Sequence, residues 1–307
     1  MRIKIGKINL NITLKDPIPS DPFLKEYQYF FSSMKNDFSE ILITVKNGNI
    51  GRKKINPDNF DRIHRIYFRE DFKNHRFTAI KEDTFTPEDI LMVQNWIRYI
   101  GIFYNVKYFR LFPLHSASFK INGKNVIISG SVCTGKTVNS IKTLLNGFTL
   151  FTDEDNLLDF SGRKLKFIPI PRLLQLRSDT VSSKAVNKFK KSLLYTERVD
   201  VFNEKINFLP IPGASKSMLK PKTADHFFFL NLNDTYPGIK ITPLEKPEII
   251  FNIFSNLINH YYLKKVKPFY RHSFNALYHI KRLPHSHEIT FGAKAREKIF
   301  DIIQEEI

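Results

Sequence analysis

Eight residues at positions 130–137 have the types and the spacing of a phosphate-binding loop. The segment Gly-Ser-Val-Cys-Thr-Gly-Lys-Thr fits the pattern of a glycine, four further residues, Gly-Lys, and then Ser or Thr. In such loops the backbone N–H groups and the N-terminus of the following helix hold phosphate oxygens. Lys136 would add a positive charge beside the outer phosphates, and the hydroxyl of Thr137 would bind Mg²⁺. The predicted nucleotide-binding residues are Gly130, Ser131, Val132, Cys133, Thr134, Gly135, Lys136 and Thr137.

The segments on either side of this loop have the periodicity that phosphate binding needs. Residues 125–129 form a short β-branched run, which is typical of a buried strand. Apolar residues then recur at helical spacing from Val138 to Leu145, and Gly147 is placed to end that helix. A strand, a glycine loop and a helix in this order distinguish the segment from a chance match in a turn rich in Gly, Ser and Thr.

A pair of acidic residues follows the next predicted strand. Residues 148–152 have the composition of a strand, and Asp153 and Glu154 come directly after them. Carboxylates at the end of a buried strand are placed to meet a metal ion that bound phosphates hold. The candidate metal ligands are therefore Thr137, Asp153 and Glu154.

One histidine and two arginines are further candidates for the same site. Asn122-Gly123 favours a tight hairpin whose first strand would begin just after His115. This placement brings His115 to the nucleotide end of the sheet, although a lone histidine is more commonly structural. Arg172 and Arg177 follow the acidic pair, and each could hold phosphate, pair with the acids or lie on the surface.

The chain divides into two predicted domains. Residues 1–105 predict a small α+β domain, in which Thr86 and Asp89 have the spacing of a helix capping box. Residues 106–307 contain the predicted loop, and their polar stretch 178–225 is expected to form partly mobile loops, with a substrate-facing lid as one role. The remaining predicted elements are strands at 1–14, 40–45, 65–69, 76–80, 226–232 and 280–284, and helices at 23–34, 247–263, 268–278 and 292–307.

Composition restricts the class of protein. Lys and Arg outnumber Asp and Glu by 48 to 30, a net charge of +18, which leaves a nucleic-acid partner open although the charges are scattered. The single cysteine, Cys133, excludes a disulfide framework and a cysteine-rich zinc site. No apolar run is long enough to span a bilayer, and the start of the chain resembles a strand rather than a secretion signal. We therefore expect a cytoplasmic protein with no membrane partner.

These motifs together resemble the HPr serine kinase/phosphorylase superfamily. Residues 114–118 (Leu-His-Ser-Ala-Ser), the hairpin, the glycine loop and residues 151–154 (Phe-Thr-Asp-Glu) carry the resemblance, which is strongest to the HPr-kinase-related bacterial kinases of peptide-modification and polysaccharide gene clusters. It implies an α/β fold with a P-loop-containing mixed β-sheet core of the HPr kinase and PEP-carboxykinase type. It also implies ATP at the loop, Mg²⁺ at Thr137 and an acid of the pair, Asp153 as general base, and His115 near the reacting phosphate.

The sequence also departs from this family. Val132, Cys133 and Thr134 stand where family members usually have Ser-Gly-Ser or Ser-Gly-Val-like residues, so the loop is bulkier. The arginine-rich signature of the phosphorylases proper is not evident after the acids. The resemblance implies transfer of phosphate to Ser or Thr of a peptide or protein. A small hydroxyl compound as acceptor, a nucleic-acid-associated NTPase, an inactive nucleotide-binding module and a homo-oligomeric state stay open.

Overall fold

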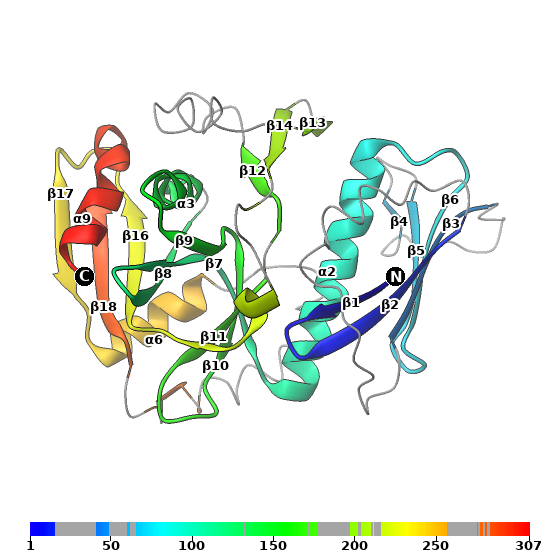
Figure 1. Cartoon of the computed structure of the whole chain (residues 1–307), viewed down its shortest axis with the longest axis horizontal. Coiled ribbons are helices and arrows are strands. Elements are labelled where there is room, and N and C mark those ends of the chain that lie inside the picture. The colour runs from blue at the N-terminus through cyan, green and yellow to red at the C-terminus, as the bar shows by residue number, and fades with distance from the viewer. Residues whose placement is uncertain are drawn as a thin grey trace. The chain divides into compact units, whose positions relative to one another are not determined.

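The structure, a computed structural model, comprises two compact units, Met1–Asn105 and Val106–Ile307 (Figure 1). Within the part of the chain that it describes, no helix is both long and apolar enough to cross a membrane. The described residues are 1–15, 41–48, 60–61, 66–131, 133–170, 172–176, 197–201, 204–209, 211, 216–256, 275, 277–278, 280 and 283–307.

The first unit is a six-stranded mixed sheet with a long helix packed against it. Gly101 of the helix lies so close to Ile5 that an added Cβ would stand 2.9 Å from the isoleucine side chain. Asn105 then donates a hydrogen bond of 2.7 Å to the carbonyl oxygen of Ile5, which fixes the helix on the sheet. In sheet order, the strands are β1 (Arg2–Ile5), β2 (Ile8–Leu14), β3 (Ile41–Asn47), β6 (Arg76–Lys81), β5 (Ile66–Asp71) and β4 (Phe60–Asp61), and the helix is α2 (Pro87–Phe109).

The predicted capping box at the start of α2 is present. The Asp89 carboxylate accepts a hydrogen bond of 2.6 Å from the Thr86 backbone N–H, and the Thr86 hydroxyl accepts one of 3.3 Å from the Asp89 N–H. Lys81 forms a buried ion pair with the same carboxylate. The cap therefore also joins the helix to the end of β6.

The second unit is built on a nine-stranded mixed sheet. Its central strand β8 runs antiparallel to β7 and parallel to β16, which is in turn parallel to β18. Strand β9 pairs with the second half of β7, and β10 pairs with the first half. In sheet order, the strands are β15 (Lys222–Thr223), β11 (Lys166–Ile170), β10 (Asp155–Asp159), β7 (Phe112–Ile121), β8 (Lys124–Gly130), β16 (His226–Leu232), β18 (His285–Phe291) and β17 (Ile239–Pro243), with β9 (Thr149–Thr152) beside β7.

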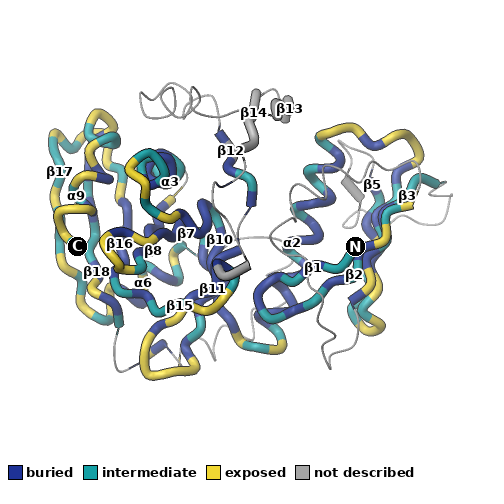
Figure 2. Tube along the Cα trace, viewed as in Figure 1, coloured by how far each residue is buried: buried dark blue, intermediate teal, exposed yellow. Residues whose placement is uncertain are grey.

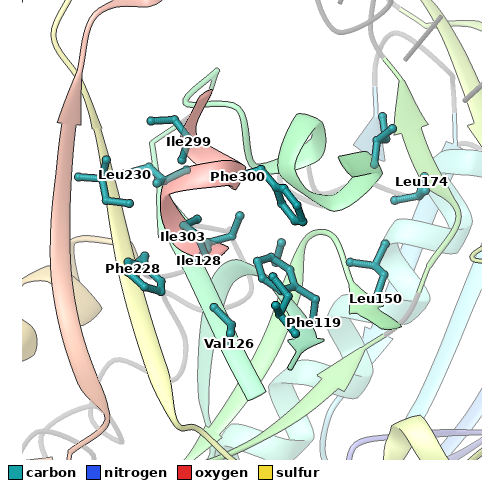
Figure 3. Packing of buried hydrophobic residues seen from close by; sticks show 14 of the residues in the cluster. Phe119, Val126, Ile128, Leu150, Leu174, Phe228, Leu230, Ile299, Phe300 and Ile303 are labelled. Atoms are coloured by element: carbon teal, nitrogen blue, oxygen red, sulfur yellow. The ribbon is translucent and has the colours of Figure 1, made fainter. Parts of the chain in front are cut away.

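Helices cover both faces of this sheet. Most residues of its central strands β7, β8 and β16 are buried (Figure 2). On one face, α3 (Lys136–Leu145) and α9 (Ile299–Glu305) pack their apolar residues on Phe119, Ile128 and Phe228, as Figure 3 shows. On the other face, α6 (Lys246–Ser255) packs on side chains that include Ile127 and Phe227. The remaining described elements are the three-stranded sheet of β12 (Leu174–Leu176), β14 (Glu204–Leu209) and β13 (Glu197–Val201), and the short helices η2 (Lys216–Leu219) and η3 (Ala293–Lys298).

The strand predicted at 280–284 is wrong. Residues 280, 283 and 284 lie outside any strand, and the last strand of the sheet is β18, at His285–Phe291. Residues 285–288 are mostly polar, so the sequence does not show the alternation of a strand there. The strand forms because it pairs in parallel with β16. β17 was not predicted, and β7 begins at Phe112, so that His115 lies within the strand and not just before it.

Several predicted elements lie wholly or partly outside the described residues. The helix at 23–34, most of the helix at 268–278, residues 257–263 of the helix at 247–263 and most of the expected loops at 178–225 lie outside the described residues. Within 178–225, the described residues include the strands β13, β14 and β15. The other predicted strands and helices are present to within a few residues.

A buried polar network joins β7 to β10. The Asn156 side chain donates hydrogen bonds of 2.9 Å to the Ser116 carbonyl oxygen and to the Ser116 hydroxyl. It accepts a further bond of 2.9 Å from the Ser118 hydroxyl. All three residues are fully buried, so every polar atom that loses its partner here stays away from water.

We predict that Asn156→Ala lowers the free energy of unfolding by about 2 kcal/mol or more, because the two serine side chains lose their buried partner. The measurement is urea unfolding followed by circular dichroism. Asn231→Ala, which removes an exposed amide from β16, is the control and should change stability by less than about 0.5 kcal/mol. Equal stability of the two variants would contradict the structural importance of the network.

Candidate functional site

The glycine loop, residues 130–137, connects the end of β8 to the start of α3. Gly130 is required by the approach of β16, because an added Cβ would lie 2.6 Å from the carbonyl oxygen of Leu230. Gly135 has a φ of +92°, a backbone conformation that favours glycine. At the other end of α3, Gly147 has a φ of +75° and donates its N–H to the Leu144 carbonyl oxygen, which ends the helix as predicted.

Cys133 occupies a position in this loop that suits glycine. Its φ is +66°, in the left-handed region that side chains with a Cβ disfavour. As the sequence indicates, the loop is bulkier here than the glycine-containing loops that it resembles. The exposed Cys133 therefore has a backbone conformation that costs free energy.

The N-terminus of α3 has no side-chain cap among the described residues, and its first turn contains no acidic residue. The first N–H groups of a helix lack partners within the helix and carry a partial positive charge. This end of α3 therefore has the properties of an anion-binding site.

Lys136 is buried at the base of the loop, with 7% of its surface exposed. Its ammonium group donates hydrogen bonds of 2.7 Å to the Gly130 carbonyl oxygen and 2.9 Å to the Ser131 carbonyl oxygen. Burial lowers the pKa of the Lys136 ammonium group from 10.5 to about 8, and the nearby carboxylates of Asp153 and Glu154 oppose that shift. An anion bound in the loop would supply the charge that favours the protonated form.

Asp153 joins the strand side of the site to the helix. One carboxylate oxygen accepts a hydrogen bond of 2.9 Å from the Thr137 hydroxyl, and the other accepts a short one from the Ser140 hydroxyl. Burial, together with the negative charge of Glu154, raises the pKa of this carboxyl group from 3.8 to about 7. The two hydroxyl groups and the charge of Lys136 act in the opposite direction. The carboxyl group can therefore take up or release a proton near neutral pH.

Glu154 and Arg172 form an ion pair beside Asp153. Arg172 is 3% exposed, whereas the Glu154 side chain is 24% exposed and so lies on the solvent side of the pair. The Glu154 carbonyl oxygen accepts a hydrogen bond of 2.8 Å from the Ser116 N–H of β7. The acidic pair thus lies where β9 ends and β10 begins, against the centre of β7.

His115 lies on β7 next to this junction. It is the cross-strand partner of Asp155, and its carbonyl oxygen accepts a hydrogen bond of 2.9 Å from the Ser129 hydroxyl at the end of β8. Its N–H donates a bond of 3.1 Å to the Asn256 carbonyl oxygen after α6. The half-buried histidine is thereby placed between the glycine-loop strand and the strand that follows the acids.

The structure therefore brings most of the predicted site residues together. The glycine loop, the acidic pair and Arg172 are connected by hydrogen bonds, an ion pair and charge interactions, and His115 lies on the adjoining strand. Val132 and Arg177 lie outside the described residues. The catalytic and ligand-binding roles of all these residues stay predictions.

Two residues near the site were missed by the sequence reasoning. Ser140 follows Thr137 at helical spacing, and this spacing could have indicated that both hydroxyl groups face the same strand. Arg296 of η3 lies against Gly135, and no local pattern connects these two distant positions.

Comparisons with known proteins give limited information about this site. No protein-family model matches the chain, and no curated protein matches it. A structural similarity is found to the HPr(Ser) kinase/phosphatase from Coxiella burnetii, with 11% sequence identity and a TM-score of 0.33. It covers 63% of this chain and 95% of that protein.

We predict that the stability of Cys133 variants follows how well the substituted residue tolerates a positive φ. Cys133→Val should lower the free energy of unfolding by about 1 kcal/mol, because a β-branched residue fits the left-handed region worst. Cys133→Gly should equal or exceed the parent protein, since relief of strain offsets the added freedom of the unfolded chain. Cys133→Ala is the control for loss of the thiol. Thermal and urea unfolding measure the order, and a valine variant as stable as the glycine variant would contradict it.

We also predict that Asp153 makes stability depend on pH. Because the pKa of its carboxyl group is higher in the folded protein than in the unfolded chain, its contribution to stability is fully present below pH 3.8 and is lost as the pH rises through about 7. Asp153→Asn should therefore flatten the decline in unfolding free energy over this interval. Asp234→Asn, at an exposed position, should leave the decline unchanged. Identical pH profiles for Asp153→Asn and the parent protein would refute the raised pKa.

Proposed function

We propose that this protein is a Mg-ATP-dependent kinase that transfers the γ-phosphoryl group to a hydroxyl group, with Ser or Thr of a peptide or protein as the acceptor. The observation that supports this most is the hydrogen bond between Thr137 and Asp153. It joins the last residue of the glycine loop, which follows the buried Lys136, to an acid at the end of the neighbouring strand. Phosphoryl-transfer enzymes use this set of groups for positioning and charge stabilisation.

The chemistry of the loop fits a nucleotide. Lys136 and the uncapped N-terminus of α3 provide positive charge, and Gly130 and Gly135 bring backbone close to the position of a ligand. Lys136 now donates to two carbonyl oxygens of the loop, and an ammonium group has three donors. In the proposed complex, Lys136 directs its charge to the outer phosphates.

The same residues fit a magnesium ion. Mg²⁺ prefers oxygen ligands, and Thr137 and Asp153 supply a hydroxyl and a carboxylate that are 2.9 Å apart. The Thr137 hydroxyl gives its hydrogen to Asp153, so an oxygen lone pair remains for a cation. When bound, the ion neutralises charge on the β- and γ-phosphates. Glu154 is a second carboxylate beside these two ligands.

In the proposed reaction, Asp153 is the general base that takes the proton of the acceptor hydroxyl group. As the acceptor oxygen forms its bond to the γ-phosphorus, the bond from that phosphorus to the β-phosphate oxygen breaks, and the acceptor proton passes to the Asp153 carboxylate. In the site without a metal ion, burial raises the pKa of the Asp153 carboxyl group to about 7, and the charge of a bound Mg²⁺ would favour the ionised form that accepts the proton. Arg172 holds Glu154 in place by their ion pair, and His115 lies on the adjoining strand, near the expected reacting phosphate.

A nucleotide-binding module without transfer activity is the second candidate. The strained Cys133 and the two loop carbonyl oxygens that now bind Lys136 favour it, because both must adapt before phosphates can enter. A small-molecule acceptor and an NTPase stimulated by nucleic acid differ from the proposal in where the phosphate goes, and one labelling experiment distinguishes them.

The experiment incubates the protein with labelled ATP, Mg²⁺ and a peptide library, a sugar mixture or water alone, with and without RNA. We predict incorporation of label into peptide Ser or Thr. Lys136→Ala should weaken nucleotide binding and lower transfer by about a hundredfold or more, since it removes the charge that meets the phosphates. Asp153→Asn should lower transfer by a similar factor and change nucleotide affinity much less. Lys120→Ala, at an exposed position of β7, is the matched control.

Each alternative has its own outcome in this experiment. Label in a sugar would indicate a small-molecule kinase, and RNA-stimulated release to water would indicate an NTPase. Tight binding with no transfer would indicate the inactive module. If Asp153→Asn retains near-normal transfer, the general-base role of Asp153 is wrong even if the kinase activity stands.

A further inference from the structure

Arg296 of η3 lies directly against the glycine loop. A Cβ added to Gly135 would stand 2.8 Å from the Arg296 Cγ and 3.1 Å from its Cδ, so the aliphatic part of the arginine occupies the space that the glycine leaves. Gly135 comes immediately before Lys136, at the N-cap of α3. A residue from near the end of the sequence is thus in contact with the centre of the proposed phosphate site.

This contact is fixed by the packing of η3 and α9 on α3. Lys142 of α3 donates a hydrogen bond to the Glu297 carbonyl oxygen, and its ammonium group lies 3.6 Å from the Asp301 carboxylate. Ile299 and Phe300, which are labelled in Figure 3, belong to the same hydrophobic core as Ile141 of α3. Both ends of α3 are therefore in contact with the segment that carries Arg296.

One polar atom of Arg296, its Nε, is buried without a hydrogen-bond partner in the described part of the chain. The side-chain oxygen of Asn139, one turn into α3, is also buried and also accepts no hydrogen bond from the described residues. Burial of a charged donor without an acceptor costs free energy, and a bound ligand with acceptor oxygens would remove that cost. The first turn of α3 supplies no acidic side chain to do so.

We propose that Arg296 is a nucleotide-binding residue that contacts the phosphate chain. The inference rests on the proposed nucleotide site and extends it, because it adds a second cation that the loop motif does not contain. A guanidinium group is always charged and presents several donors to phosphate oxygens, whereas Lys136 acts as a point charge. The segment that contains η3 and α9 is then part of the ligand site and not only a cover for the core.

The test compares the binding of Mg-ATP and of inorganic tripolyphosphate by isothermal titration calorimetry. We expect Arg296→Gln to weaken both by about tenfold or more, because both ligands lose the same charge-assisted hydrogen bonds. Arg296→Lys should recover part of the affinity. Lys294→Gln removes the same charge from an exposed position of η3 and should change affinity by less than about threefold. Thermal unfolding of each variant checks that η3 and α9 stay folded.

The single thiol gives a second measurement that needs no catalysis. Cys133 lies in the loop and is exposed, so bound Mg-ATP should slow its alkylation, and Arg296→Gln should need a higher nucleotide concentration for the same protection. If the parent protein binds Mg-ATP and Arg296→Gln binds it equally well, the proposal for Arg296 is overturned alone. A loss of ATP affinity with unchanged tripolyphosphate affinity also overturns it, because the contact would then be to the nucleoside. If the parent protein binds neither ligand, the proposed function itself fails.

Discussion

The site depends on the burial of one carboxylate, that of Asp153, against the first turns of α3. Its two oxygens accept hydrogen bonds from Thr137 and Ser140, so the junction of β9 and β10 is tied to the helix that begins in the glycine loop. A charged carboxylate away from water is costly, and these two hydroxyl groups and Lys136 are what favour its ionised form. The position of the acidic pair relative to the loop follows from this arrangement.

The strand order of the second unit brings the acidic pair close to the glycine loop. β7 pairs with β8 on one side and with both β9 and β10 on the other, so the break between β9 and β10 lies beside β7 and one strand away from the loop. The buried network of Asn156 with Ser116 and Ser118 holds this register, and a slip by one residue would separate those partners. The fold therefore positions the acids through polar contacts within the sheet as well as through apolar packing.

Local signals account for what the sequence could predict. The glycine pattern, the Asn122-Gly123 hairpin and the Thr86 capping box each act over a few residues, and each element is present where the pattern placed it. β18 is different, because polar residues interrupt its alternation and its strand conformation comes from pairing with β16, more than fifty residues earlier. The same limit applies to Arg296, whose contact with Gly135 exists only after η3 and α9 have packed on α3.

The balance of charge in the site explains why a cation outside the loop motif matters. Lys136 and Arg172 are both placed near acidic groups: Lys136 experiences the charges of Asp153 and Glu154, and Arg172 is paired with Glu154. These four residues are therefore close to neutral as a group. A nucleoside triphosphate keeps net negative charge even with Mg²⁺ bound, so it needs positive potential beyond theirs. The uncapped N-terminus of α3 supplies a part of it, and Arg296 adds a positive charge whose aliphatic stem packs against Gly135 and whose buried Nε has no hydrogen-bond partner among the described residues.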